Sequence, residues 1–378
     1  MSDVYKKSLE LHRQHGGKLA VASKVPLQDE NDLALAYTPG VSEVCRVIAA
    51  DKSLASTYTM KGNTVAVITD GSAVLGLGNL GPEAALPVME GKCILFKEFA
   101  GVDAVPLCLD TQDEEEIIKT IKYLAPNFGG INLEDISAPR CFNIEARLKA
   151  ELDIPVLHDD QHGTATVVLA GLINALQLRA LSKTEAKIII NGAGAAGLAI
   201  TNLLLRYGFK NIIVLDSRGS IYAGRDNLDK EKTKVAALTN KAMLMGDLAE
   251  VIKGADIFIG VSLGGILSAA MVESMNERPI IFALANPVPE IMPDVAKAAG
   301  AFVVATGRSD FANQINNVLA FPGIFRGALD NKITQIDDTM LIHAAENLAK
   351  LVTDINVENI LPSPFNREVV KVVAQAMR

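Results

Sequence analysis

The sequence has no tryptophan, few aromatic residues and no paired cysteine motif. Among its 378 residues, 5% are aromatic and only 4 are cysteine. Cys45, Cys93, Cys108 and Cys141 have no CxxC spacing. In a chain of this length that pattern argues against a disulfide framework or a cysteine zinc site. We therefore expect reduced, buried thiols.

Long hydrophobic runs and an excess of positive charge are also missing. The richest apolar stretch, residues 164–178, is interrupted by Asn174 and is shorter than the ~20 residues that span a bilayer. Residues 1–20 contain no apolar segment typical of a secretion signal. The formal net charge is −8, from 36 Lys+Arg and 44 Asp+Glu, which disfavours a nucleic-acid partner. We expect a cytoplasmic protein that binds small molecules and neither membrane nor nucleic acid.

Short β-branched runs alternate with longer helical patterns along the chain. This alternation predicts an α/β fold with mostly parallel sheets. The runs are continuously apolar, as is typical of strands covered by helices on both faces. The expected strands are residues 65–69, 104–109, 131–133, 154–157, 188–190, 212–215, 257–259, 280–284 and 302–305.

The length predicts two domains, because single hydrophobic cores rarely grow beyond ~250–300 residues. A helical pattern over residues 164–178 and a new strand from residue 186 place the boundary near residues 157–163. We expect residues 1–160 to form a smaller α/β domain. Residues 161–378 are expected to form a Rossmann-type, doubly wound parallel sheet that ends in a helical tail, residues 339–378.

A GxGxxG motif follows one expected strand and opens a helix. Its residues are Gly192, Ala193, Gly194, Ala195, Ala196 and Gly197. Such a loop turns tightly and presents helix N–H groups to a pyrophosphate. Asp216 ends the next strand, where a carboxylate binds ribose hydroxyls and favours NAD, whereas Arg218 suits the 2′-phosphate of NADP. The structural alternative is a tight turn without a ligand, and the choice between NAD and NADP stays open.

Two pairs of acidic residues also follow expected strands. Glu134 and Asp135 form the first pair, and Asp159 and Asp160 form the second, 25 residues further on. Carboxylate oxygens in this number suit Mg²⁺ or Mn²⁺. The structural alternative is that each pair caps a helix N-terminus.

Other polar residues each have a chemical and a structural interpretation. His158 and His162 suggest zinc, although their spacing falls on a turn rather than on a helix. Lys92 precedes an apolar segment, so it is either a base with a lowered pKa or a surface lysine with a buried stem. Tyr37 is either a reactive phenol or a packed aromatic ring. The glycine-rich loop at residues 76–81 lacks the lysine of a P-loop and suits a small anion.

Taken together, these motifs resemble the malic enzyme family in its short bacterial form. The matching segments are YTPG (37–40), TDG (69–71), LGLGNLG (75–81), EGK (90–92), LED (133–135), HDDQHGTA (158–165), NGAGAAG (191–197), ANP (285–287), GRSD (307–310) and NNV (316–318). The resemblance implies a first domain that binds metal and carries out catalysis, and a second that binds NAD(P). The implied reaction is metal-dependent oxidative decarboxylation of (S)-malate to pyruvate and CO2, with reduction of NAD or NADP.

The resemblance also assigns a metal site and a proton-transfer pair. It implies that Glu134, Asp135 and Asp160 bind Mg²⁺ or Mn²⁺, with Asp159 beside them. Lys92 is then the general base, a role that requires a neutral amine near pH 7, and Tyr37 is the general acid.

The remaining implied roles concern the substrate, the nicotinamide and the quaternary structure. Asn286 is similar to a residue that contacts both substrate and cofactor, and Asn317 to a substrate contact. Longer members carry an arginine for a substrate carboxylate in the stretch at residues 70–75, and this chain has none. Ser72 and the loop at residues 76–81 are the expected replacement. The short form is expected to be a homodimer, in which Tyr37 serves its own site or that of a partner.

Three rival functions use the same motifs. The first is oxaloacetate decarboxylation on the same fold, and the second is a non-catalytic NAD-binding redox sensor. The third is an amino-acid dehydrogenase, which uses a buried lysine without a metal.

Overall fold

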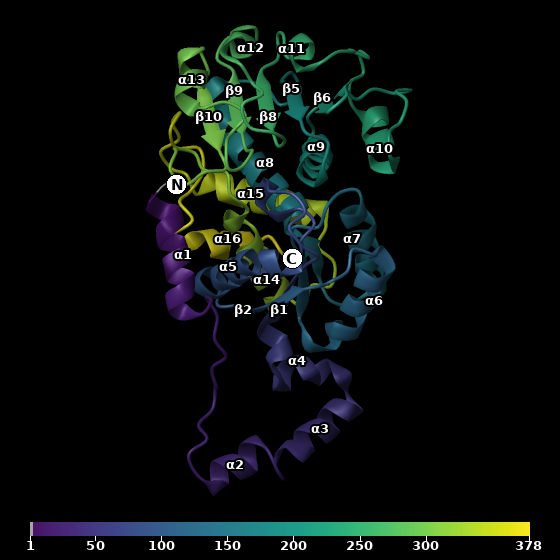
Figure 1. Ribbon diagram of the computed structural model, residues 1–378, viewed down its shortest axis with the longest axis vertical. Coiled ribbons are helices and arrows are strands. Elements are labelled where there is room, and N and C mark those ends of the chain that lie inside the picture. Colours follow the sequence, from purple (N-terminus) through teal and green to yellow (C-terminus); the bar gives the residue numbers. More distant parts are fainter. Residues whose placement is uncertain (1–2) are drawn as a thin grey trace.

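Two sheets organise the chain in the computed structural model, which describes residues 3–378 (Figure 1). The smaller sheet contains, in spatial order, β2 (Asp103–Cys108), β1 (Thr64–Thr69), β3 (Gly130–Leu133) and β4 (Val156–His158). The larger contains β10 (Val303–Thr306), β9 (Ile280–Ala283), β8 (Ile257–Gly260), β5 (Lys187–Asn191), β6 (Asn211–Asp216) and β7 (Gly219–Ser220). All neighbouring strands are parallel except β7, which is antiparallel to β6. The nine expected strands and the two-sheet α/β class are confirmed. The two-residue β7 is too short to leave a periodic pattern.

The smaller sheet is covered on both faces. Its crossover helices are α5 (Pro82–Ala100), α6 (Glu114–Leu124) and α7 (Arg140–Glu151). Because alternate residues of a strand point to opposite faces, Val65 packs into the same core as Phe96 of α5. Ile68 packs into the opposite core with Ile117 of α6. This double burial explains why β1 reads as a continuous apolar run.

The larger sheet is built in the same way. Its helices are α9 (Ala195–Tyr207), α10 (Lys230–Leu238), α11 (Leu248–Val251), α12 (Ala269–Glu273) and α13 (Pro293–Ala298). Ile188 and Ile190 of β5 face one core, and Ile189 faces the other. The result is the Rossmann-type sheet expected for the second half of the chain.

Helix α8 (Asp159–Arg179) connects the two sheets and is buried over most of its length. It begins directly after β4 and packs against α9 and α15 (Asp338–Lys350). The expected boundary between residues 160 and 161 falls in its first turn. That boundary stays a prediction, because one continuous helix serves both halves.

The C-terminal part packs back on the first sheet through α14 (Phe321–Asp330) and α16 (Glu368–Ala374). The rings of Phe321 and Phe325 contact Phe96 of α5 with centroid distances of 4.7 and 5.4 Å. Gly327 of α14 allows α16 to approach closely, because a Cβ at this position would lie 2.4 Å from the carbonyl oxygen of Ala374. The expected helical tail, residues 339–378, consists of α15 and α16. A non-helical segment, residues 351–367, separates these two helices.

The N-terminal arm, residues 19–58, projects from the body of the molecule (Figure 1). After α1 (Asp3–His15), it carries α2 (Glu30–Ala36), α3 (Val41–Ala50) and α4 (Ala55–Tyr58), none of which contains a buried residue. The segment Glu30–Ala50 is long and apolar enough to cross a membrane. This is weak evidence for a membrane span, because a turn at residues 37–40 divides the segment into two short helices.

Candidate active site

Three carboxylates from two neighbouring strand ends form an acid cluster: Glu134, Asp135 and Asp160. The first two follow β3, and Asp160 lies in the first turn of α8 after β4, the strand paired with β3. One ligand oxygen of each lies within 4.8 Å of the others. No side chain of the two pairs caps a helix, because the N-cap residues of α7 and α8 are Pro139 and His158. The capping alternative is wrong.

The electrostatics of the acid cluster favour a bound cation. Burial raises the pKa of Glu134 to about 7, and repulsion by Asp160 adds to the shift. Burial and the same neighbour raise the pKa of Asp135 to about 9. Oδ2 of Asp135 is buried without a hydrogen-bond partner. Three crowded carboxylates with a free oxygen fit a hard divalent ion such as Mg²⁺ or Mn²⁺.

The flanking histidines do not join this cluster. Among residues 3–378, the single group with metal-ligand geometry is the acid cluster, and it contains no histidine. Nε2 of His162 instead hydrogen-bonds Oε2 of Glu145 at 2.9 Å. The zinc interpretation is therefore not supported.

Lys92 lies at the centre of the site, on α5. It is only 7% exposed, so the interpretation as a surface lysine is wrong. Its Nζ donates to Oδ2 of Asp159 at 2.6 Å and lies 2.9 Å from Oε1 of Glu134. On the side of the second domain, Nζ lies 3.4 Å from Oδ1 of Asn317. One ammonium group therefore contacts residues from three separate segments.

The protonation of Lys92 differs from the expectation of a neutral amine near pH 7. Burial lowers its pKa, but the carboxylates of Asp159 and Glu134 outweigh burial and raise the pKa well above its ordinary value. Lys92 is thus charged in this arrangement. A cation held by the acid cluster would offset the negative charge that now raises this pKa.

Sequence reasoning missed two residues that support the site. Asn132 is buried in β3, and its amide donates to Oε2 of Glu134 at 2.9 Å. A polar residue inside an apolar strand was the available signal. Glu145 of α7 is also buried and accepts the backbone N–H of His158 at 2.9 Å. No local sequence pattern predicts the role of Glu145, because its hydrogen-bond partner, His158, lies 13 residues away.

The hydroxyl of Ser72 is already occupied. It donates to Oδ1 of Asp70 at 2.5 Å and accepts the backbone N–H of Ser137 at 2.9 Å. The expectation that this side chain binds a substrate carboxylate therefore needs correction, because the hydroxyl proton is committed.

The neighbouring glycine-rich loop at residues 76–81 meets the second domain. A Cβ on Gly76 would lie 2.7 Å from the carbonyl oxygen of Asn286, which follows β9. Asn286 is exposed, and its amide lies beside Gly307 after β10. Asn286 and the loop thus form one edge of the space between the domains.

The glycine motif has the geometry that a pyrophosphate requires. Gly192 has a φ of 122°, and a Cβ there would lie 2.6 Å from the carbonyl oxygen of Val261. Gly197 packs even more closely, since a Cβ there would lie 1.7 Å from the carbonyl oxygen of Gly192. A Cβ on Gly194 would meet no atom within 4 Å, so space is open before the N-terminus of α9. The loop therefore fits a dinucleotide.

Asp216 ends β6 as expected, and basic residues surround it. Its carboxylate accepts hydrogen bonds from Arg225 at 2.5 Å and from Lys232 at 3.1 Å. Burial raises its pKa, but these hydrogen bonds and the backbone N–H of Arg218 lower it to about 2. The carboxylate is ionised, and the cations around it suit a phosphate.

The structure does not bring Tyr37 to Lys92 within one chain. Tyr37 follows α2 on the N-terminal arm and is 67% exposed. In Figure 1, α2 and α3 of the arm lie at the bottom of the molecule, away from α5 near its middle. Of the other predicted residues, Lys92 contacts Asn317 across the two halves of the chain, and the loop at residues 76–81 contacts Asn286.

A Rossmann-type domain joined to a smaller α/β domain, with a buried lysine and an acid cluster between them, defines a metal- and dinucleotide-dependent oxidoreductase. The family model "Malic enzyme, N-terminal domain" matches residues 16–149. The model "Malic enzyme, NAD binding domain" matches residues 161–377. The chain belongs to the malic enzyme family.

Curated relatives and solved structures agree with this assignment. The chain is 56% identical over 374 residues to the bifunctional malic/malolactic enzyme of Bacillus subtilis, covering 98% of this chain and 91% of that protein. It is 56% identical over 364 residues to the NAD-dependent malic enzyme of Geobacillus stearothermophilus, covering 96% and 76%. The crystal structure of the NAD-dependent malic enzyme of Thermotoga maritima superposes with a TM-score of 0.95 at 49% identity, covering 98% of both chains.

Proposed function

We propose that this enzyme catalyses the metal-dependent oxidative decarboxylation of (S)-malate to pyruvate and CO2, with reduction of NAD or NADP. The observation that carries the proposal is the contact of buried Lys92 with Asp159 and Glu134, beside the acid cluster and next to Asn317 of the dinucleotide-binding half. This juxtaposition supports a site at which a general base, a divalent cation and the nicotinamide ring would meet around one substrate.

The acid cluster would hold Mg²⁺ or Mn²⁺ through Glu134, Asp135 and Asp160. Such an ion, when bound, polarises hydroxyl and carbonyl oxygens of a substrate. With the cation bound and Lys92 in its neutral form, Nζ would receive the proton of the 2-hydroxyl while hydride leaves for the nicotinamide ring. Asp159 holds that Nζ in place through the 2.6 Å hydrogen bond.

Residues from both domains would orient the substrate. Asn317 approaches Lys92 from the second domain, so its amide is placed to contact the same substrate oxygen. Asn286 lines the edge of the space beside the loop at residues 76–81. Since the Ser72 hydroxyl is committed, we assign carboxylate binding to backbone N–H groups of that loop, with Ser72 fixing its base.

Tyr37 would act across a homodimer. Its side chain is exposed on an arm that has no buried residue in α2, α3 or α4. The arm carries large exposed apolar side chains, among them Leu27, Leu33 and Leu35. Such a surface is typical of a protein interface. A second copy would bury these side chains and receive Tyr37 as the acid that protonates C3 of enolpyruvate.

Localisation in the cytoplasm stays a prediction.

The test is the initial rate of NAD(P)H formation from (S)-malate and Mn²⁺, with NAD and NADP in parallel and EDTA as a control. We expect metal-dependent reduction with an equal amount of pyruvate. CO2 release from oxaloacetate without any reduction would favour the decarboxylase. Turnover in EDTA would favour an amino-acid dehydrogenase type of site, and NAD binding without turnover would favour a redox sensor.

A malolactic reaction is the second candidate. The name of the Bacillus subtilis relative, at 56% identity, includes that activity. Lactate formation without net NADH accumulation distinguishes it, so lactate and pyruvate are both measured in the same assay.

A further inference from the structure

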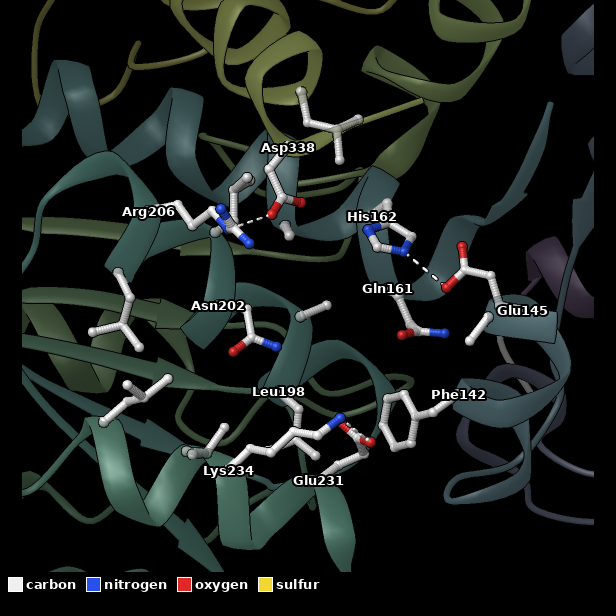
Figure 2. A pocket seen from close by; sticks show the side chains of 18 residues that line it. Phe142, Glu145, Gln161, His162, Leu198, Asn202, Arg206, Glu231, Lys234 and Asp338 are labelled. Atoms are coloured by element: carbon white, nitrogen blue, oxygen red, sulfur yellow. Dashed lines mark hydrogen bonds and ion pairs between the residues drawn. The ribbon is translucent and has the colours of Figure 1, made fainter. Parts of the chain in front are cut away.

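Glu145 of α7 contacts the start of α8 from outside the acid cluster. Its Oε1 accepts the backbone N–H of His158 at 2.9 Å, and its Oε2 hydrogen-bonds Nε2 of His162, also at 2.9 Å. Figure 2 shows this carboxylate facing the imidazole of His162 between the two helices. His158 and His162 lie two residues before and two residues after Asp160. One carboxylate therefore contacts the first turn of α8 on both sides of a residue of the acid cluster.

The N-cap residue of α8, His158, makes no capping hydrogen bond with its own side chain. Side chains usually cap a helix N-terminus, because the first four backbone N–H groups have no partner within the helix. In a capping box, a Glu at the third helical position accepts the N–H of the N-cap residue. Glu145 makes this contact from a neighbouring helix, and its negative charge complements the positive end of the α8 dipole. The start of α8 thus depends on α7.

The carboxyl group of Glu145 is ionised although it is buried. Burial by itself would raise its pKa, but the neighbouring His162 and Lys149 outweigh burial and hold the pKa well below its usual range. Lys149 lies one turn further along α7, with its Nζ 2.9 Å from Oε1 of Glu145. Both carboxylate oxygens are therefore hydrogen-bond acceptors at neutral pH, and each has a partner on α8.

These contacts bear on the direction of the Asp160 side chain. At about 100° per residue, positions 160 and 162 lie about 200° apart around α8. When His162 points to α7, Asp160 therefore points to the other side of the helix, where its Oδ2 accepts the backbone N–H of Asp135 at 2.9 Å. The acid cluster lies on that side, and its ionised carboxylates repel one another when no cation is bound. Glu145 holds the turn against this repulsion.

We propose that Glu145 is a positioning residue of the metal site, which fixes the first turn of α8 so that the Asp160 carboxylate stays within reach of a divalent cation. The inference rests on the proposed function, because it requires that the acid cluster binds metal. Glu145 acts through His158 and His162 and would contact neither the cation nor the substrate. Residues that orient metal ligands in this way typically account for about 10–100-fold in metal affinity.

The test is the Kd of Mn²⁺, measured by calorimetry on the full-length enzyme without substrate or dinucleotide. We expect Glu145→Ala to raise this Kd by about 10–100-fold. Glu145→Gln should stay within about threefold of wild type, because the amide keeps an oxygen for the N–H of His158 and a donor for neutral His162. Leu148→Ala is the matched control, since Leu148 is buried on the same helix in the core of the smaller sheet. It should lower Tm by leaving a cavity and should not change the Kd.

Wild-type affinity in Glu145→Ala would overturn the proposal, and so would an equal loss in Leu148→Ala or in Glu145→Gln. The first control tests general loosening of α7, and the second keeps the two hydrogen bonds. A wild-type enzyme that binds no Mn²⁺ would instead contradict the metal site itself, so the two failures are distinguishable. If Glu145→Ala does not unfold cooperatively, His162→Ala decides. Loss of this one contact should raise the Kd by about threefold or more, and an unchanged Kd would overturn the proposal.

Discussion

Lys92 and Asp159 form a buried ion pair, with Nζ 2.6 Å from Oδ2, between residues 67 positions apart in the chain. The side chain of Asp159 is fully buried, and that of Lys92 is 8% exposed. A buried pair of this kind contributes little net stability, because desolvation of both charges offsets their attraction. Its value lies in fixing the position of Nζ beside the acid cluster.

Replacing Lys92 should stop the chemical step. We expect Lys92→Ala to lower kcat by ~10²–10⁴-fold, the range over which a general base contributes, while NAD binding is retained. Steady-state rates and NAD titrations measure the two effects. Lys97→Ala, on the same helix in an exposed ion pair with Asp103, is the control and should keep nearly full activity. More than a tenth of wild-type kcat in Lys92→Ala would exclude it as the base.

Removing one member of the acid cluster should weaken metal binding. We expect Asp160→Asn to raise the Kd of Mn²⁺ by about 100-fold, since a hard cation loses a charged oxygen ligand. Calorimetry or electron paramagnetic resonance measures this Kd directly. Asp110→Asn, two residues after β2 on the same edge of the sheet, removes an acid outside the cluster and should leave the Kd unchanged. Equal affinities in the two variants would contradict the assignment of the metal site.

The stability of the metal-free enzyme should fall as the pH rises. Folding raises the pKa of Glu134 to about 7 and that of Asp135 to about 9. Unfolded carboxylates titrate near ~4, so unfolding releases protons between that pH and the folded pKa. The free energy of unfolding therefore decreases across this window.

Bound metal should reverse that loss, because it requires the ionised carboxylates. We expect Mn²⁺ to raise Tm more at about pH 8 than at about pH 5.5, measured against EDTA. The substitution Asp135→Asn, which removes the more strongly shifted group, should reduce this pH dependence. A Tm increase independent of pH would show that the cluster does not bind the ion.

Mixing two inactive variants should restore activity if Tyr37 acts across the dimer. After subunit exchange between Tyr37→Phe and Lys92→Ala, half of the dimers are mixed, and each has one intact site. We expect about a quarter of wild-type activity on this statistical basis. If Tyr37 serves its own chain, no mixed dimer has an intact site and activity stays absent. Lys92→Ala mixed with itself is the control.

The carboxylate of Asp216 should set the preference for the dinucleotide. We expect Asp216→Ser to shift the ratio of kcat/KM for NADP over NAD upward by roughly tenfold. The substitution removes the carboxylate that would accept hydrogen bonds from the ribose. It also frees Arg225 and Lys232, which now donate to Asp216, to bind a 2′-phosphate. Parallel initial rates with the two cofactors measure the ratio. Asp226→Ser, in the loop that follows Arg225, is the control.

Much of the fold was predictable because its signals are local. The strands of both sheets are buried on two faces, so each reads as a short apolar run, and the glycine motif needs only one strand, one turn and one helix. The acid pairs were equally visible, since strand ends in a parallel sheet share an edge. By contrast, the course of the N-terminal arm and the position of α16 against α14 depend on contacts between distant segments, which leave no periodic pattern.

The sequence by itself determined the two-sheet α/β architecture, the dinucleotide loop and the residues able to hold a metal, because these follow from hydrophobic period, glycine geometry and acid spacing. The tertiary structure alone decided the state of three side chains. It buried Lys92 against two carboxylates and so raised a pKa that burial alone would lower. In the folded chain the hydroxyl of Ser72 donates to Asp70. Tyr37 lies on the N-terminal arm, away from Lys92 of the same chain. Each outcome depends on which charges and partners lie nearby in space, and the chain order does not encode that directly.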